Sequence, residues 1–546
     1  MRRLVVIALV AAACSGRGPQ SVGSQPSWRG KTQVSGPPRP VVFAPSTAPA
    51  VHYNEPVGPP PPSKLGDAIA SAARDAAQEL RLPAPISDAR LFRACTELAQ
   101  IVPEEGIIAY SLVEFALQRH GIIEPSPHLL VVWGDIDSPR QIVEQLRPRL
   151  AEILADGATA RLGIGAAKRT PDGVGAVVFA LQASGVRTQP IPRSLPSGGS
   201  FALEASVDPR YRDPEVYVTR HGGTVERIEL RPGKDGGFTA QVSCGDATGK
   251  QQIEIAASDE QGSTVLANFP VWCGAEPPAT LTVEPSQDDV PVADPLEAER
   301  RVLALVNRDR QAAGLAALAW DERVAEVARG HSDEMRRTKI VAHVSPTTGS
   351  AVDRVRVAKI KTAVVLENVA RAYGLGEAHQ GLMNSPGHRA NLMSGAATHI
   401  GIGIVFGDEV SGRREIFVTQ VFIRIPPKVD PAVAAESIRK RIAALRPVGS
   451  DPALAVIAQD LASGMARGQT RDEAYGPLRP RIEALARKYA RVGSIILTAA
   501  DLEHIDVASL LGDTKPDEIG VGIGQGNHAE IGEGAIFIAV LLGTKR

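Results

Sequence analysis

The sequence predicts a multidomain α+β protein in which one domain is built of strands alone. Three observations lead to this prediction. The chain has 546 residues, which is room for about three to five domains of usual size. Two proline-rich segments, residues 15–63 and 276–293, separate the rest into folded parts. These parts differ in pattern, because some repeat apolar residues every three or four positions and one alternates apolar with polar residues.

The composition fits folded domains that have no general preference for polyanions. Hydrophobic residues make up 43% of the chain, which is enough for packed cores. The 60 Lys and Arg residues balance the 61 Asp and Glu residues, and the formal net charge is −1. Aromatic residues, at 4%, are too few to suggest a surface that stacks the bases of a single strand. Nucleic acid is therefore not expected as a partner.

Residues 1–14 are typical of an export signal. Arg2 and Arg3 precede an apolar run, Leu4–Ala13, that is too short to span a bilayer as a helix. The run ends in Ala11-Ala12-Ala13-Cys14, which resembles a bacterial lipobox, where the cysteine is lipidated and becomes the new N-terminus. An ordinary secretory signal peptide is the alternative. The sequence thus predicts an exported protein whose acyl chains on Cys14 anchor it in the bacterial cell envelope, at the outer membrane or cell surface.

The next two segments are a tether and a first folded domain. Residues 15–63 are rich in Pro, Ser and Gly and include the run Pro59–Pro62, so we expect a semi-extended tether. Residues 64–185 are predicted to form an α+β domain. One of its helices is expected to begin at Asp88, and Cys95 on the apolar face of that helix is expected to be a buried thiol.

Residues 195–275 alternate apolar and polar side chains between frequent glycine turns. Short strands at this spacing favour an immunoglobulin-like β-sandwich, although a β-domain of another topology remains open. Cys244 and Cys273 both lie in this segment. Because an exported protein meets oxidising conditions, we predict that they form a disulfide.

After the linker at residues 276–293, residues 294–426 combine helices with strands. Asp294 followed by Pro295 predicts a helix start, and Gly314 a helix end. A second helix opens at Asp321 and carries one apolar stripe, Val324, Ala328, His331 and Met335. Two alternating strands, at residues 398–406 and 415–423, close the unit.

Several short motifs occur in order within this unit. They are Leu318-Ala-Trp320-Asp321, His331-Ser332-Asp333, His343-Val-Ser345-Pro346, Asp353-Arg354, Leu366-Glu367-Asn368, Ser385-Pro-Gly-His388-Arg389-Ala-Asn391 and Val418-Thr-Gln420-Val-Phe422. Together they resemble the CAP superfamily, named for cysteine-rich secretory proteins, antigen 5 and pathogenesis-related proteins. The resemblance implies a CAP-type αβα sandwich with a solvent-filled cleft.

In this superfamily two histidines and one or two acidic residues line the cleft. The resemblance carries this role onto His343, Glu367 and His388, with Asn368 and Asn391 beside them. Two imidazoles and one carboxylate, with water as the fourth ligand, would suit a divalent cation such as Zn²⁺ or Ca²⁺. His343 and His388 are the expected metal ligands, and Glu367 is the expected base if the site is catalytic.

Three positions depart from the family pattern. Members with a second cleft acid place it just before the last histidine, and the corresponding position here is Ser385. Leu382 stands where Trp is usual, and Leu366 stands where Gly is usual. Loss of an acid lowers the affinity for a cation, and the two leucines change the shape of the cleft. These departures bear on catalysis more than on fold.

Two functions are compatible with these residues. The favoured one is a binding module whose cleft takes a lipid, a glycan or a peptide, with a divalent cation as a potential part of the site. The alternative is a metal-assisted hydrolase, peptidase-like, that acts on an envelope polymer. A covalent serine mechanism is disfavoured, because the sequence contains no Gly-x-Ser-x-Gly elbow.

An internal repeat is also suggested by the sequence. Asp88, Asp321 and Asp451 each open a similar helix, and each is followed by a glycine-containing strand signal, Leu162–Gly165, Ile400–Gly403 and Ile519–Gly522. We predict that residues 430–546 form another α+β domain, and that this domain and residues 64–185 are degenerate copies of the CAP-like unit. Coincidence between unrelated α+β domains is the alternative.

Overall fold

The computed structural model describes most of the chain from residue 40 onward. The described residues are 6–10, 16–17, 40–103, 108–125, 127–155, 157, 159–171, 173–284, 286, 288, 290–410, 413–426, 428–499, 502, 505–507, 511, 514–529 and 531–546. Cys14, the predicted lipidation site, lies outside them. Within the described residues, no helix is long and apolar enough to cross a membrane.

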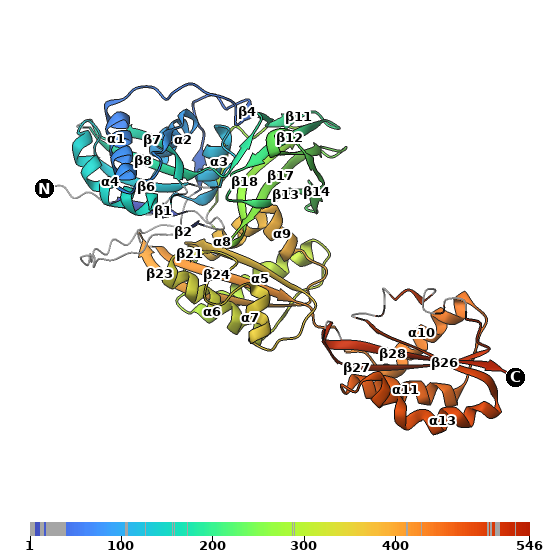
Figure 1. Cartoon of the computed structure of the whole chain (residues 1–546). Coiled ribbons are helices and arrows are strands. Elements are labelled where there is room, and N and C mark those ends of the chain that lie inside the picture. Colours follow the sequence, from blue (N-terminus) through green and yellow to red (C-terminus); the bar gives the residue numbers. More distant parts are fainter. Residues whose placement is uncertain are drawn as a thin grey trace.

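The N-terminal unit is a sheet between two layers of helices (Figure 1). Its sheet has the order β1-β6-β8-β7-β5. The strands are β1 (Val6–Val10), β5 (Ile86–Ser87), β6 (His128–Asp135), β7 (Thr159–Lys168) and β8 (Val174–Ala183). The helices are α1 (Lys64–Glu79), α2 (Ala89–Ile101), α3 (Tyr110–Arg119) and α4 (Pro139–Leu154). Helices α2 and α3 pack on one face and α1 and α4 on the other. Cys95 is buried and unpaired, and burial raises the pKa of its thiol.

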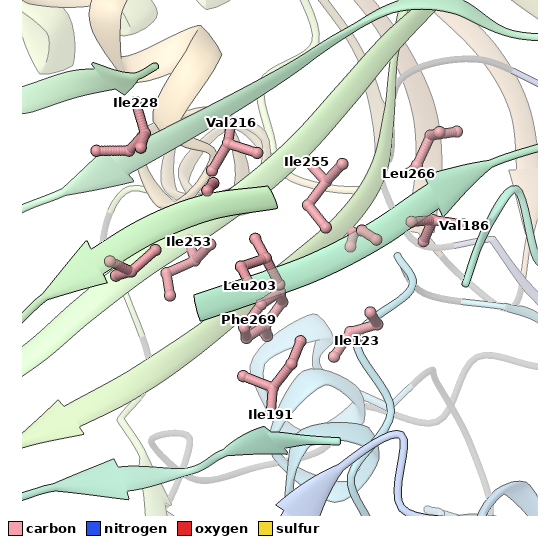
Figure 2. Close-up of a cluster of buried hydrophobic side chains, with 14 of the residues drawn as sticks. Ile123, Val186, Ile191, Leu203, Val216, Ile228, Ile253, Ile255, Leu266 and Phe269 are labelled. Atoms are coloured by element: carbon pink, nitrogen blue, oxygen red, sulfur yellow. The ribbon is translucent and has the colours of Figure 1, made fainter. Parts of the chain in front are cut away.

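The second unit consists of two facing sheets. One has the order β15-β16-β12-β9 and the other β11-β18-β17-β13-β14. The strands are β9 (Val186–Thr188), β11 (Ser194–Leu195), β12 (Ser200–Val207), β13 (Arg212–Thr219), β14 (Val225–Ile228), β15 (Leu230–Pro232), β16 (Phe238–Ser243), β17 (Gly249–Asp259) and β18 (Gly262–Cys273). Figure 2 shows Leu203, Ile253 and Phe269 meeting in the shared core. The predicted Cys244–Cys273 disulfide is confirmed.

The third unit is a three-layer α–β–α arrangement. Its sheet has the order β20-β23-β24-β22. The strands are β20 (Ala319–Trp320), β22 (Val365–Ala372), β23 (His399–Val410) and β24 (Arg413–Ile423), and a separate short strand, β21 (Ile340–Val341), pairs with β2 (Gly16–Arg17). The helices are α5 (Pro295–Ala312), α6 (Glu322–Thr338), α7 (Ala351–Val357), α8 (Leu375–Asn384) and α9 (Pro386–Leu392). Helix α6 packs on one face of the sheet, and α5 and α8 pack on the other. The mixed α+β class is thus confirmed.

The C-terminal unit repeats the same kind of layering (Figure 1). Its sheet has the order β25-β27-β28-β26. The strands are β25 (Gly449–Ser450), β26 (Tyr489–Ala499), β27 (Glu518–His528) and β28 (Gly532–Lys545). The helices are α10 (Pro431–Leu445), α11 (Pro452–Ala466), α12 (Arg471–Tyr475) and α13 (Arg479–Ala484).

The two proline-rich segments are less free than the sequence suggests. Strand β3 (Val41–Phe43) pairs with β19 (Leu281–Val283), so that part of the predicted tether meets part of the predicted linker. Strand β4 (His52–Tyr53) pairs with β10 (Ile191–Pro192). Phe43 and Tyr53 are both buried. Burial of these two aromatic side chains is the physical reason that residues 41–43 and 52–53 lie against the folded units.

The three α–β–α units share one strand order. In each unit a two-residue strand runs parallel to a long strand, and two further long strands follow in the sheet. The corresponding orders are β5-β7-β8-β6, β20-β23-β24-β22 and β25-β27-β28-β26. In each, an aspartate caps the following helix with its side chain, and these residues are Asp88, Asp321 and Asp451. This common topology supports the interpretation of the sequence as a repeat.

The helix after each aspartate lies directly on glycines of the first long strand. A Cβ on Gly401 would lie 2.2 Å from the backbone nitrogen of Ala325, and one on Gly403 would lie 2.1 Å from that of Arg329. Gly163 and Gly165 meet α2 in the same way, and Gly520 and Gly522 meet α11. The Gly-x-Gly signal therefore marks a contact between a helix backbone and a strand backbone, which no other residue type permits at that distance.

We expect opposite effects from two glycine-to-alanine substitutions in the central unit. Gly403→Ala forces α6 away from β23 and should destabilise the unit by about 2–3 kcal/mol. Gly330→Ala is the matched control, because Gly330 is exposed on α6 with open space around it, and it should stabilise by about 0.5–1 kcal/mol. Scanning calorimetry of the full chain measures both shifts. Equal effects of the two substitutions would contradict the close contact.

Candidate functional site

The structure brings the three predicted cleft side chains together. His343 follows β21, Glu367 lies on β22 and His388 lies on α9. The rings of His343 and His388 stack with their centroids 6.2 Å apart and their planes 23° apart. His343 Nδ1 lies 3.0 Å from Glu367 Oε1. Two imidazoles and one carboxylate thus form one cluster, as the motif order predicts.

Glu367 is held by two cationic or potentially cationic neighbours. The Arg354 guanidinium of α7 donates to Glu367 Oε2, while His343 meets Oε1. Burial opposes ionisation of Glu367, but the hydrogen bond from His343 and the positive charges of His343 and Arg354 outweigh it and hold the pKa of the carboxyl below its usual value. Both carboxylate oxygens are therefore engaged, which suits the orientation of His343 better than proton abstraction.

The two predicted asparagines connect the elements that carry the cleft. Asn391 Nδ2 donates to the Glu367 carbonyl oxygen and to Asn368 Oδ1, both at 3.0 Å. Asn368 Nδ2 donates to the His388 carbonyl oxygen at 3.2 Å and to Gln420 Oε1 at 3.1 Å. These bonds join α9, β22 and β24, so the two asparagines position the site residues.

His388 is a buried, neutral imidazole. Its Nδ1 lies 2.6 Å from Ser385 Oγ, and its side chain sits at the start of α9. Burial, followed by the positive charge of His343, lowers the pKa of His388 to about 3. At physiological pH it therefore presents one donor and one acceptor nitrogen.

Glu254 is a functional candidate that the sequence reasoning missed. It lies on β17 of the two-sheet unit and is only 1% exposed. Its carboxyl group bonds Ser385 Oγ, and Oε1 accepts a bond from the Gly387 backbone nitrogen at 2.9 Å. Burial, partly offset by those two hydrogen bonds, raises the pKa of Glu254 to about 7. An acid from another domain thus reaches Ser385, the position where the family pattern has its second cleft acid.

The two-sheet unit covers the cluster through several further contacts. The backbone nitrogen of Val344 donates to the Gln261 carbonyl at 2.9 Å, in the turn between β17 and β18. Arg389 Nε donates to the Gly223 carbonyl at 2.9 Å, and Asn268 Nδ2 to the Asn384 carbonyl at 3.2 Å. The expected open cleft is consequently a seam between two domains, and the His343 side chain remains 21% exposed.

A narrow cavity lies beside this seam. Its volume is about 40 Å³, and its walls come from α3, β18, β22 and α8 as well as from Ser385 and His388. That volume is enough for about three ordered waters or one small functional group. Leu382, which stands where the family has Trp, contributes to the lining.

The residues present do not form a three-ligand metal site in this arrangement. Among the described residues, no group of three His, Cys, Asp or Glu side chains could hold an ion. Glu367 already receives bonds on both oxygens from Arg354 and His343. A divalent cation at His343 and His388 stays a prediction, and no chemical step is derived from it.

The central unit matches a known family. Residues 303–422 match the model described as the cysteine-rich secretory protein family, CAP. The chain is 40% identical over 107 residues to the uncharacterized membrane protein YlbC of Bacillus subtilis, covering 19% of this chain and 31% of that protein. It is 37% identical over 108 residues to YkwD of the same organism, covering 20% and 42%. The chain thus spans less than half the length of these curated relatives.

Two solved structures also resemble this chain. An extracellular protein with an SCP domain from Bacillus anthracis is 22% identical, with a TM-score of 0.21, and covers 41% of this chain and 82% of its own. An outer surface protein of Borrelia burgdorferi is 19% identical, with a TM-score of 0.22, and covers 24% of this chain and 96% of its own.

Glu254 should make stability depend on pH in a defined direction. Its folded pKa of about 7 exceeds the ordinary 4.5, so its contribution is complete below pH 4.5 and is lost as the pH rises through 7. The difference corresponds to about 3 kcal/mol. We expect Glu254→Gln to lack this component, and Glu204→Gln, an exposed change on β12, to retain it. Thermal unfolding of the three proteins between pH 4.5 and 8 measures it, and parallel curves for all three would contradict the assignment.

Proposed function

Because residues 303–422 belong to the cysteine-rich secretory protein family, we propose that this chain is a cell-envelope protein whose CAP domain binds a ligand at His343, Glu367 and His388. The ligand class is a lipid, a glycan or a peptide. One observation carries the proposal: two imidazoles stack on each other, each is held by a buried partner, and one of them, His388, lines a cavity. Such preorganised polar groups are typical of recognition sites.

The geometry supports binding over hydrolysis. Glu367 is a weak base in this setting, since two donors occupy its oxygens and its pKa is held low. Ser385 lies between Glu254 and His388, whereas a catalytic triad has the histidine between the serine and the carboxylate. Neither arrangement supplies an activated nucleophile. Metal-assisted hydrolysis therefore remains the weaker alternative.

The outer α–β–α units fit the role of spacers. The strand register places Glu367 opposite Val421, which is also opposite Gly401. In the outer units, Gly163 and Gly520 correspond to Gly401. When the strand pairing is followed across the sheet in the same way, Gly163 leads to Leu129 and Gly520 leads to Ser494, so these two residues occupy the place of Glu367. Asn368 is likewise replaced by Leu130 and Ile495. We infer that these units are degenerate copies that keep the backbone contacts and lack the site.

Location in the envelope completes the proposal. Relatives are described as an extracellular protein, an outer surface protein and a membrane protein. The export signal and the lipobox-like Cys14 favour a lipid anchor. Cleavage before Cys14 would also remove β1, which pairs with β6 at the edge of the N-terminal sheet.

Ligand binding is tested on the full chain with three defined probes: N-acetylglucosamine trimer, oleate and tetra-alanine. We expect one of them to bind, and His388→Gln to weaken it about tenfold to a hundredfold, because a buried hydrogen-bonding group is lost. His52→Gln, a half-exposed histidine outside the site, is the control and should change nothing. Calorimetry measures all three proteins, with ZnCl₂ and CaCl₂ titrated separately to test the cation. Heats that are the same for wild type and His388→Gln would contradict the proposed site.

Lipid anchoring is tested at Cys14. We expect Cys14→Ser to move the protein from the membrane pellet to the soluble fraction, because acyl chains supply about 0.8 kcal/mol per buried methylene. Ser15→Ala, the neighbouring substitution, should stay in the pellet. Fractionation and intact mass, which reports the acyl chains, measure the outcome. An unchanged distribution and mass would leave an ordinary secreted protein.

A further inference from the structure

A buried chain of three side chains crosses the seam between the two-sheet unit and the CAP domain. It runs from Glu254 on β17 through Ser385 to His388 on α9. Glu254 is 1% exposed, Ser385 6% and His388 7%. The proposed function uses His388 but gives no role to Glu254.

The hydrogens of this chain can be assigned by counting donors for the state in which Glu254 is ionised, which prevails at a pH above its pKa of about 7. Glu254 Oε1 accepts from the Gly387 backbone nitrogen, which always donates. An ionised carboxylate can only accept, so the single hydrogen of Ser385 Oγ must point to Glu254 Oε2. Ser385 Oγ can then only accept from the ring of His388, whose Nδ1 lies 2.6 Å away. The proton of the neutral imidazole therefore sits on Nδ1 and the lone pair on Nε2.

We propose that Glu254 is a positioning residue of the CAP cleft, which acts through Ser385 to hold the proton of His388 on Nδ1. The site is then built by two domains, and the two-sheet unit is part of it. A second-domain carboxylate fixes a histidine tautomer here in the way that carboxylates orient imidazoles in many sites.

A consequence for the ligand rests on the proposed function. With the lone pair on Nε2, a group that bonds this nitrogen must be either a hydrogen-bond donor or a metal cation. A sugar hydroxyl or a peptide N–H satisfies this condition, whereas a carboxylate or a phosphate oxygen does not. Within the three ligand classes proposed above, the tautomer favours a glycan or a peptide over an anionic lipid head group.

A merely adhesive role would not require an acid at position 254. The seam already holds the Val344–Gln261, Arg389–Gly223 and Asn268–Asn384 hydrogen bonds. Glutamine could accept from Gly387 with its oxygen and donate to Ser385 with its amide, preserving both contacts. It would, however, reverse the chain, because Ser385 would then donate to Nδ1 and the imidazole proton would move to Nε2. Glutamate and glutamine at this position are therefore equivalent for adhesion and opposite for the tautomer.

Nitrogen-15 NMR of the full chain, labelled at histidine, reads the tautomer directly. At pH 8.5 the Glu254 carboxyl, whose pKa burial raises to about 7, is ionised. His388→Gln assigns the His388 signals by their loss. We expect the protonated-type signal from Nδ1 in the wild type and in Glu204→Gln, the exposed control on β12. In Glu254→Gln the two nitrogens should exchange signal types.

The readouts separate this proposal from the proposed function. A protonated Nε2 of His388 in the wild type at pH 8.5 would overturn the proposal by itself. An unchanged His388 tautomer in folded Glu254→Gln would also overturn it. Ser385→Ala gives an independent check, since removal of the relay should cost His388 its preference for Nδ1–H. The expected tautomers without binding of any probe would overturn the proposed function and leave the role of Glu254 standing. Binding of a probe with the opposite tautomer would do the reverse.

Discussion

The backbone contact between α6 and the glycines of β23 is the constraint from which the rest of the central domain follows. It fixes the distance between helix and sheet, and the sheet register then sets β22, which carries Glu367 and Asn368. Through Asn368 and Asn391, β22 in turn sets α9 and His388. The outer units keep the same contact at Gly163 and Gly520 but have apolar or hydroxyl residues at the site positions. Scaffold and chemistry are thus separable in this chain.

Much of this architecture follows from local sequence patterns. Aspartate helix caps, the Gly-x-Gly strands and the order of the CAP motifs predicted helices, strands and the cluster of His343, Glu367 and His388, because each signal concerns residues within one domain. The close contact that the glycines make with the helix backbone was not predicted. The partners across domain boundaries could not be predicted in this way. Strand 249–259 is buried on both faces, and alternation accounts only for the face in the sandwich core. The prediction of a tether rested on proline-rich composition alone and took no account of Phe43 and Tyr53, which are buried.

Two buried carboxyls, one bonded to His343 and the other to Ser385, have pKa values shifted in opposite directions. Glu367 faces Arg354 and His343, so its charge is compensated and its ionised form is favoured. Glu254 has a hydroxyl and an amide as partners and no cation bonded to it among the described contacts, so burial dominates and the protonated form gains. One acid provides a permanent charge beside His343, while the other lies near its transition at neutral pH beside Ser385. The two histidines of the cleft are therefore in unequal electrostatic settings.

The seam between the two-sheet unit and α9 also limits how far the CAP domain can be treated as a portable module. A fragment cut at residues 294–426 would lose the acid that reaches Ser385. It would also expose to water the backbone carbonyl oxygen of Asn384 and the backbone nitrogen of Gly387, which the neighbouring domain now satisfies. Recombination of this domain into another chain would face the same deficit unless an acid were restored at position 385 itself. Excision would thus create a new cleft, with its own tautomer and hydration, rather than isolate the existing one.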